Sequence, residues 1–350
     1  MNHIQIGKRW VGTGQPCFII AEAGSNHNRQ LKQAFRLIDA AAAAGCDSVK
    51  FQTFKADKIY SRKTPMATYL KKNKLVKKGE TIWDVIKKNE LPREWHRDLA
   101  AYCRSKKILF LSTPFDLEAV DELEKVGVPA YKIASFEITH LPLLSRVAET
   151  KKPVILSTGM ANLDDIEVAL DTIYKKGNQK VILLHCAINY PPKFEDVHLK
   201  AMDTLQQAFQ TLIGYSDHTM GYVADVVAVA RGACVIEKHF TTSRQLKGPD
   251  HPFALEPDEL KEMVSSIRTA EKTLGSPIKR HTEAEQELYQ LARRSLVAAK
   301  HIEAGTKLTK EMIDVKRPGY GIPTKLMDVV VGRKAKRNIE EDEILTWEMI

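Results

Sequence analysis

The chain alternates short apolar runs with longer segments in which apolar residues recur at helical spacing. Each apolar run is five to seven residues long and is followed by a loop and a helical segment. Continuous apolar runs of this kind are typical of strands that are buried on both faces of a parallel sheet. We predict eight such strands, at residues 17–22, 48–52, 108–113, 130–135, 153–159, 181–186, 211–216 and 234–240.

Eight strand–helix units predict an α/β fold, a (β/α)8 TIM barrel with its helices outside the parallel strands. An open, doubly wound sheet is the alternative, and it would place a glycine-rich phosphate-binding turn after the first strand. That turn is missing, because Gly24 stands alone there. We therefore expect the barrel.

The alternation ends before the C-terminus, which indicates a second domain. A helix expected at residues 258–274 completes a catalytic barrel domain at 1–275, and a polar linker follows at 276–293. Residues 294–350 contain short strands and turns marked by glycine and proline, and predict a small domain near the size limit for independent folding. Within the barrel, a lysine-rich segment at 55–88 is too long for an ordinary loop after a strand.

Composition narrows the setting in which this fold works. No stretch of about 18 apolar residues is present, and the N-terminus lacks the apolar core of a signal peptide, so we expect a cytoplasmic protein without a membrane partner. The five cysteines form no C-x-x-C pair, which predicts reduced, structural thiols. The net charge of +9 is not interleaved with aromatic residues, so it does not indicate nucleic-acid binding and instead favours small anionic substrates.

Functional side chains gather where the predicted strands end. The carboxyl ends of TIM-barrel strands surround the active site, and charged groups at the end of a buried strand need partners. Every predicted strand ends in such groups, which makes the whole set more informative than any single member. The set comprises Glu22, Lys50, Gln52, Ser112, Thr113, Lys132, Ser135, Ser157, Thr158, His185, Ser216, Asp217, His218, Glu237, Lys238 and His239.

Two groupings within this set predict chemistry. His218 and His239 end neighbouring strands and can converge on one divalent ion. A lone histidine is more often a core or loop residue, but a pair at one mouth, beside Asp217 and Glu237, favours a metal site. The other grouping is a cationic bowl suited to a phosphate and a carboxylate, formed by Lys50, Lys132, Lys238 and the hydroxyls of Thr113, Ser135 and Ser157.

Nine motifs follow one another along the chain: IIAEAGSNHN, VKFQ, FLSTPFD, YKIAS, STGM, LHCAINYP, YSDHT, IEKHF and GPDH. Together they resemble the sialic acid synthase family, which includes N-acetylneuraminate, legionaminate and pseudaminate synthases and the spore-coat polysaccharide synthase branch. The segment from Arg294, with KRPGYG, is similar to the family's antifreeze-like (SAF) domain. The resemblance thus covers nearly the whole chain.

The resemblance implies a metal-dependent condensation of phosphoenolpyruvate with the open-chain aldehyde of an N-acylated amino-hexose. The products would be a nine-carbon 2-keto acid and phosphate, released by C–O cleavage. The enzyme would be an N-acetylneuraminate synthase-type transferase and a homodimer, in which each SAF domain covers the barrel of the other subunit. The implied metal is Mn²⁺, with Mg²⁺ or Co²⁺ as alternatives.

The resemblance also implies a role for each matching residue. His218 and His239 match the family's metal ligands, and Glu22 matches the carboxylate beside the reacting aldehyde. Arg317 matches an arginine that the SAF domain inserts into the other subunit's barrel. The matches to phosphoenolpyruvate contacts are Lys50, Thr113, Lys132, Ser135, Ser157 and Ser216, and those to acceptor contacts are Gln52, Tyr190 and Asp250.

One position departs from the family pattern. The resemblance leads us to expect Asn two residues before Tyr190, where this chain has Ile188, although Asn189 can substitute. This leaves N-acetylmannosamine and a 6-deoxy diacetamido analogue open as acceptors. Two other functions also stay open: a neighbouring phosphoenolpyruvate-dependent keto-acid sugar synthase, which usually lacks a SAF domain, and a non-catalytic carbohydrate-binding or coat protein, which has no need of the full strand-end set.

Overall fold

The structure is a computed structural model that describes residues 3–65 and 79–350. Part of the lysine-rich segment predicted at residues 55–88 therefore lies outside the described residues. Contacts within the chain divide it into two units, Met1–Gly275 and Ser276–Ile350. None of the helices in the described ranges is long and apolar enough to cross a membrane.

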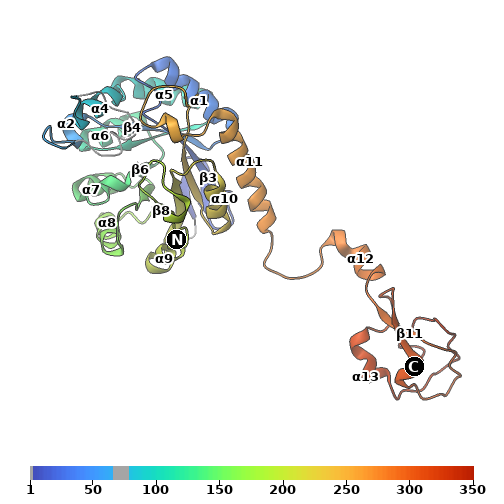
Figure 1. Ribbon diagram of the computed structural model, residues 1–350. Coiled ribbons are helices and arrows are strands. Elements are labelled where there is room, and N and C mark those ends of the chain that lie inside the picture. The colour runs from blue at the N-terminus through green and yellow to red at the C-terminus, as the bar shows by residue number, and fades with distance from the viewer. Residues whose placement is uncertain (1–2, 66–78) are drawn as a thin grey trace. The chain divides into compact units, whose positions relative to one another are not determined.

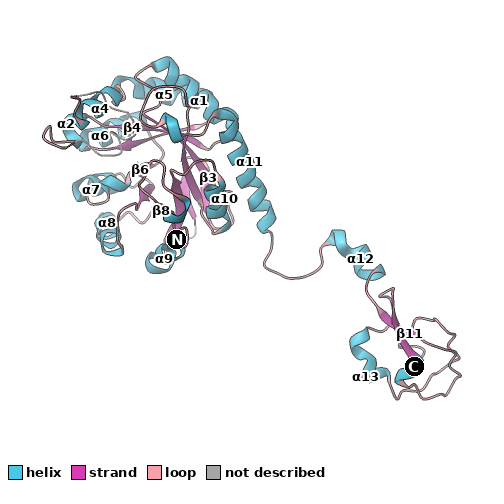
Figure 2. Cartoon of the chain, in the orientation of Figure 1, coloured by secondary structure: helices cyan, strands magenta, loops and turns pink. Residues whose placement is uncertain are grey.

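The first unit contains the predicted barrel, in which parallel strands are surrounded by helices (Figures 1 and 2). The strands hydrogen-bond in the order β5-β4-β3-β10-β9-β8-β7-β6. The two strands at the ends of this order, β5 and β6, also pack against each other. The strands are β3 (Phe18–Gly24), β4 (Ser48–Thr53), β5 (Leu109–Pro114), β6 (Tyr131–Ile133), β7 (Val154–Ser157), β8 (Val181–Cys186), β9 (Leu212–Asp217) and β10 (Val235–His239).

The helices begin and end at residues that suit their positions. Asn162 caps α8 by accepting a hydrogen bond from the Asp165 amide, and Gly45 ends α1 with a φ of 84°, a left-handed conformation that favours glycine. Two helices, α2 and α4, come from the long segment after β4. The barrel helices are α1 (Leu31–Ala44), α2 (Ala56–Ile59), α4 (Ile82–Asn89), α5 (His96–Ser105), α6 (Leu117–Val126), α7 (Leu141–Glu149), α8 (Leu163–Lys175), α9 (Ala201–Phe209), α10 (Val223–Ala230) and α11 (Pro257–Leu274).

Side chains alternate between two cores along each strand, as the two-residue period of a strand requires. In β3, Phe18 and Ile20 belong to the core inside the barrel, whereas Ile19 and Ala21 pack in the core between strands and helices. A hairpin of β1 (His3–Ile6) and β2 (Arg9–Gly12) adds its own apolar side chains to the inner core. The amino-terminal end of the barrel interior is therefore apolar, and its polar positions lie toward the carboxyl ends of the strands.

The second unit has its own apolar core. An antiparallel pair, β11 (Ser295–Ala298) and β12 (Ile313–Lys316), packs with α13 (Met327–Val330), and α12 (Gln286–Leu291) precedes the pair. Arg317 follows β12 directly and is exposed in this unit.

Candidate active site

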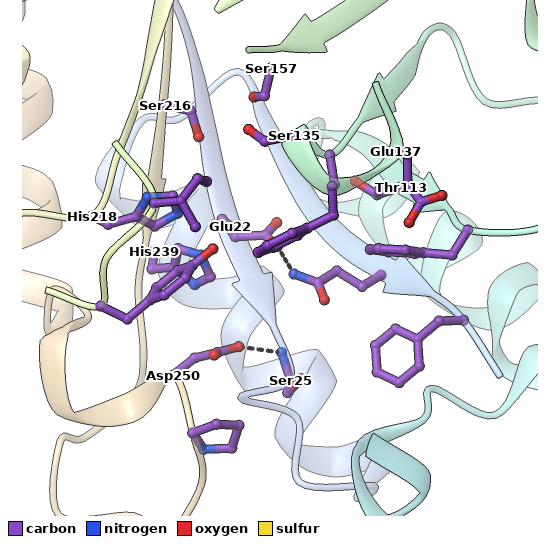
Figure 3. A pocket seen from close by; sticks show the side chains of 18 of the residues that line it. Glu22, Ser25, Thr113, Ser135, Glu137, Ser157, Ser216, His218, His239 and Asp250 are labelled. Atoms are coloured by element: carbon purple, nitrogen blue, oxygen red, sulfur yellow. Dashed lines mark hydrogen bonds between the residues drawn. The ribbon is translucent and has the colours of Figure 1, made fainter. Parts of the chain in front are cut away.

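A cavity of about 420 Å³ lies at the carboxyl ends of the barrel strands, within the range usual for small-molecule sites. Its side chains converge from several strands and from the loops that follow them (Figure 3). Twelve of the fourteen residues that the sequence assigned to a site line this cavity: Glu22, Lys50, Gln52, Thr113, Lys132, Ser135, Ser157, Tyr190, Ser216, His218, His239 and Asp250.

Four buried charged side chains form what we call the cavity cluster: Glu22, Lys50, Lys132 and Glu237. Lys50 Nζ lies 2.7 Å from Glu22 Oε2 and 3.8 Å from Glu237 Oε2. Lys132 Nζ lies 3.4 Å from the other oxygen of Glu237. Lys50 also donates a hydrogen bond to Thr113 Oγ1 at 3.0 Å. Acidic and basic groups therefore alternate, which is how charges can be kept away from water.

The two carboxylates of the cavity cluster differ in acidity. Burial raises the pKa of Glu22 to about 7, even though Lys50 acts in the opposite direction. Burial also acts to raise the pKa of Glu237, but Lys132 and Lys50 outweigh it, so the pKa of Glu237 ends below its usual value. Glu237 therefore stays ionised near neutral pH, whereas Glu22 can exchange a proton there.

Three serine hydroxyls lie together at one edge of the cavity (Figure 3). Ser216 Oγ donates to Glu237 Oε1 at 3.0 Å, and Ser135 Oγ accepts from the amide of Gly159 at 3.0 Å. Ser157 Oγ is buried and makes no hydrogen bond to the described part of the chain. Because a buried hydroxyl normally has a partner, this edge suits a ligand with several acceptor oxygens.

Two histidines face the cavity from neighbouring strands, on the other side of Glu22 from Thr113 in Figure 3. The ring centroids of His218 and His239 are 5.3 Å apart. Burial lowers the pKa of His218 to about 4, and that of His239 also falls well below its usual value, mainly through burial. Both imidazoles are therefore neutral near pH 7, the form that binds metals.

The donor set fits a metal that is held partly by its substrates. His218 Nδ1 lies 3.1 Å from the carbonyl oxygen of Ala187, which orients the ring so that Nε2 is the nitrogen that could hold a metal. His239 Nδ1 is buried without a hydrogen-bond partner in residues 3–65 and 79–350. The same residues contain no group of three or more His, Cys, Asp or Glu side chains placed to hold an ion. Two imidazoles with substrate or water oxygens would complete such a site.

Three residues predicted to contact the acceptor sugar, Gln52, Tyr190 and Asp250, line the cavity. Gln52 Nε2 donates to Glu22 Oε1 at 2.7 Å, so it also orients that carboxylate. Asp250 accepts a hydrogen bond from the Ser25 amide at 3.0 Å (Figure 3), and burial raises its pKa. The ring of Tyr190 packs 4.4 Å from the ring of His218.

One predicted site residue of the barrel unit does not line this cavity. Asn189 is exposed, whereas Ile188 and Tyr190 on either side of it line the cavity. Ile188 packs so closely on Gly159 that a Cβ there would lie 2.4 Å from Ile188 Cγ1. Arg317 belongs to the second unit, where it is exposed.

Lys238 does not join the predicted cationic bowl. It is buried on the outer face of β10 and forms an ion pair with Asp217 and a hydrogen bond to the Thr219 carbonyl. The reason is the alternation of strand side chains, which turns Glu237 and His239 inward and Lys238 outward. Lys132, by contrast, does lie in the cavity, where it faces Glu237. From the sequence, Glu237 was expected beside the metal.

Three other members of the strand-end set also bond outside the cavity. Ser112 Oγ lies 2.7 Å from the hydroxyl of Thr53, and Thr158 Oγ1 donates to a strand carbonyl at 3.0 Å. His185 Nε2 bonds at 2.7 Å to the carbonyl of Val197. None of the three lines the cavity.

The cavity also has an apolar side that the sequence analysis missed. Half of its residues lie on α2 and α4, and in the sequence the segment that contains these helices is conspicuous for its lysines rather than for its apolar residues. No spacing signal in the sequence connects these residues with the strand ends. The apolar side comprises Phe54, Ile59, Ile82, Val85, Ile86, Phe115, Phe136 and Ile188.

Sequence and structure comparisons show which known proteins this chain resembles. Residues 37–279 match the model of the NeuB family, and residues 293–350 match the SAF domain. An N,N'-diacetyllegionaminic acid synthase of Campylobacter jejuni is 45% identical over 93% of this chain and 98% of its own length. A second protein of that name, from Legionella pneumophila, is 43% identical over 97% and 96%. A crystal structure of N-acetylneuraminic acid (sialic acid) synthetase from Leptospira borgpetersenii has a TM-score of 0.73 at 36% identity, covering 82% of this chain and 95% of that one.

Proposed function

The chain belongs to the NeuB family and carries a SAF domain, and from this premise we propose that it condenses phosphoenolpyruvate with an N-acylated amino-hexose. The family resemblance expected from the sequence is thereby confirmed. The observation that supports the reaction most directly is one cavity that combines the cavity cluster, serine hydroxyls and two neutral histidines. A phosphate, a carboxylate and an aldehyde would each find suitable partners there.

Phosphoenolpyruvate would bind at the cavity cluster and its hydroxyls. Lys132 makes one hydrogen bond to the described chain, to the carbonyl of Ile133 at 3.1 Å, although an ammonium group has three donors. The unpartnered hydroxyl of Ser157 and the hydroxyl of Ser135, which accepts from the Gly159 amide, add donors for phosphate oxygens. Ser216 also lines the cavity, but its proton is already donated to Glu237, so it would bind phosphate only by exchanging that partner. Charge-assisted hydrogen bonds of this kind contribute about 1.5–3 kcal/mol each.

The reaction balances with the groups present. C3 of phosphoenolpyruvate forms a C–C bond with the aldehyde carbon, water adds at C2, and the C2–O bond to phosphate breaks. The electrons of the C2–C3 double bond form the new C–C bond, and the oxygen of the added water becomes the ketone oxygen at C2. That water loses two protons, of which one ends on the former aldehyde oxygen and the other leaves with the phosphate as hydrogen phosphate. Glu22, held by Gln52 and Lys50, would accept a proton from that water, and its raised pKa supports this role.

His218 and His239 would hold the divalent ion, which we propose is Mn²⁺ or, failing that, Mg²⁺ or Co²⁺. When bound, the ion supplies Lewis acidity that polarises the aldehyde. The chain contributes two imidazoles that burial keeps neutral and that the Ala187 carbonyl helps to orient.

For the acceptor, we propose a 6-deoxy diacetamido sugar rather than N-acetylmannosamine. The apolar side of the cavity, including Ile188, suits methyl groups better than hydroxyl groups, because a hydroxyl buried there would lack a partner. The two relatives named as N,N'-diacetyllegionaminic acid synthases support the same class. N-acetylmannosamine remains the alternative.

A panel of acceptors tests this function. Purified protein is incubated with phosphoenolpyruvate, Mn²⁺ and either N-acetylmannosamine or a 6-deoxy diacetamido hexose, and phosphate and keto-acid mass are measured. Phosphate should appear only when both sugar and metal are present, fastest with the diacetamido sugar. Phosphate release without any aldose would exclude a condensing enzyme.

The position of bond cleavage separates this function from other chemistry. With ¹⁸O in the bridging position of phosphoenolpyruvate, the label should leave with the phosphate. A label retained in the keto acid would indicate P–O cleavage and a different reaction class. The product mass separates a nine-carbon acid from the seven- or eight-carbon acids of neighbouring synthases, and a coat protein without catalysis would give no product.

We also propose that the active unit is a homodimer in which Arg317 of one subunit completes the barrel site of the other. The support is the exposed position of Arg317 after β12, where Pro318 and Gly319 shape the turn. Co-expression of Glu22→Ala and Arg317→Ala chains tests this. Exchange in trans gives each mixed dimer one intact site and restores activity, whereas an arrangement in cis leaves every site damaged. An inactive mixture with demonstrated subunit exchange would refute the arrangement in trans.

A further inference from the structure

A second ionic group lies directly behind the two histidines, on the outer face of the strands. Lys238 and Asp217 are opposite each other in the register of β10 and β9, and both are buried. Lys238 Nζ donates to Asp217 Oδ2 and, at 2.6 Å, to the carbonyl oxygen of Thr219. One side chain thus binds the residues on both sides of His218.

Asp217 fixes this turn further. Its Oδ1 accepts from the hydroxyl of Tyr215 and from the amide of Thr219, both at 2.8 Å. Its Oδ2 accepts from Thr219 Oγ1 at 2.8 Å in addition to Lys238. The backbone on each side of His218 is therefore tied to the residue that precedes His239.

Stability alone does not explain this arrangement. Burying two opposite charges removes both from water, and the net contribution of a buried ion pair to stability is often small. Here a second carboxyl group, that of Asp225 on α10, is buried 3.8 Å from the same ammonium group, and burial raises its pKa well above the usual value. Neither of its oxygens forms a hydrogen bond to the described part of the chain.

We propose that Lys238 and Asp217 form a positioning clamp that sets the separation of the imidazoles of His218 and His239 for a divalent ion. This inference rests on the proposed role of the two histidines as metal ligands. Neither clamp residue lines the cavity. They act through the backbone of the turn at His218 and of the end of β10.

Metal binding to the full-length protein, without substrates, tests the clamp. Mn²⁺ affinity is measured by titration calorimetry or by the electron paramagnetic resonance signal of free Mn²⁺. Lys238→Met removes the donor but keeps the length of the side chain, and it should weaken Mn²⁺ binding about 10- to 100-fold, as loss of outer-shell partners does. Phosphoenolpyruvate affinity of the metal-free protein should change less than about twofold, because Lys50 and Lys132 are untouched.

Asp225→Asn is the matched control: burial raises the pKa of Asp225 well above its usual value, so asparagine keeps the size and the neutral charge of a group that lies beside the same ammonium and Asp217. It should alter melting temperature while leaving Mn²⁺ affinity within about threefold. If Lys238→Met does not fold, Thr219→Val removes one bond to Asp217 with little change in shape and should still weaken Mn²⁺ binding about threefold or more.

Two outcomes would overturn the clamp. One is a Mn²⁺ affinity that falls equally in the Lys238→Met and Asp225→Asn proteins, in step with stability, and the other is an affinity unchanged in both Lys238→Met and Thr219→Val. An unsubstituted protein that bound no divalent ion would refute the metal role and the clamp together. A protein that bound Mn²⁺ but made no keto acid would refute only the proposed reaction, since the clamp is decided by binding.

Discussion

The cavity cluster and the positioning clamp are both buried and ionic, yet their hydrogen-bonding groups are used differently. In the cavity cluster, Lys132 bonds only to a backbone carbonyl within the described chain and contacts Glu237 at 3.4 Å. In the clamp, the two oxygens of Asp217 accept four hydrogen bonds. Donors left over in a cavity are available to a ligand, whereas a saturated network resists movement. The difference supports the proposed division between ligand binding inside the barrel and positioning of the histidines from outside it.

This division runs through three consecutive residues of β10. Glu237 and His239 face the cavity, and Lys238 between them faces α10. The same strand therefore supplies a buried charge to both clusters, and substitutions one residue apart should have separable effects.

The strongest test removes a proposed ligand from the cavity side. His239→Ala should abolish stoichiometric Mn²⁺ binding and lower turnover about a thousandfold or more, because metal catalysis contributes several kcal/mol of transition-state stabilisation. His185→Ala is the matched control, since that imidazole lies near the end of β8 but bonds to the Val197 carbonyl outside the cavity. Elemental analysis and rate measurements check both. Full metal occupancy in inactive His239→Ala protein would contradict the ligand assignment.

The two buried lysines give the next largest contrast. Lys132→Met should raise the Michaelis constant for phosphoenolpyruvate about 10- to 100-fold, the loss expected for one charge-assisted bond, with a much smaller effect on the sugar. Lys238→Met should leave the phosphoenolpyruvate affinity of the metal-free protein nearly unchanged and should weaken Mn²⁺ binding instead. Titrations of each variant with each ligand make the comparison. If both lysines affected phosphoenolpyruvate alike, the division between cavity cluster and clamp would fail.

The fold was predictable because the chain repeats one pattern. Eight apolar runs that each end in polar groups leave few arrangements other than a closed barrel, and the structure has the strands where the runs lie. Glycine at the end of α1 and the absence of a glycine-rich turn after β3 pointed the same way. The family was predictable because the nine motifs resemble those of the sialic acid synthases.

The site was predictable only in part, because the sequence shows which residues end a strand but not which way each side chain turns. Lys238 was assigned to the bowl although the alternation from Ile236, which packs against the helices, already places it on the outer face. Asn189 was assigned to the acceptor, yet the chain there turns Ile188 and Tyr190 toward the cavity. The apolar contribution of α2 and α4 depends on how a long insertion folds back, and no local pattern encodes that.

The pH dependence of kcat/KM should distinguish the two carboxylates of the cavity cluster. If Glu22 accepts a proton from water, it must be ionised, so kcat/KM should fall roughly tenfold per pH unit below about pH 7, its raised pKa. Glu237, whose pKa is lowered, should not titrate in this range. A rate profile from pH 5 to 8 measures the effect.

Substitution of Glu22 tests whether this group causes the fall in kcat/KM at low pH, the acid limb of the profile. Glu22→Gln keeps the size of the side chain and should leave a low, flat profile. Glu137→Gln is the control, because Glu137 also lines the cavity and has a pKa raised by burial. An acid limb that persisted in Glu22→Gln protein would assign the proton transfer to another group.

The smallest expected effect concerns the choice of acceptor sugar, which we assign to the apolar side of the cavity rather than to the cavity cluster or the clamp. Ile188 lies against Gly159, whose amide bonds to Ser135, so it borders both the proposed phosphate contacts and the space for the sugar. Ile188→Asn would introduce a hydrogen-bonding group where the chain now offers only methyl groups. Discrimination at a single contact of this kind is worth about tenfold. We therefore expect the ratio of kcat/KM for N-acetylmannosamine to that for the diacetamido sugar to rise about tenfold.

The control, Ile188→Val, keeps an apolar surface and should leave this ratio nearly unchanged. Mn²⁺ affinity should stay the same in both variants, because neither substitution touches the clamp. A ratio that moved equally in the two variants would mean that cavity size, rather than polarity at residue 188, selects the acceptor.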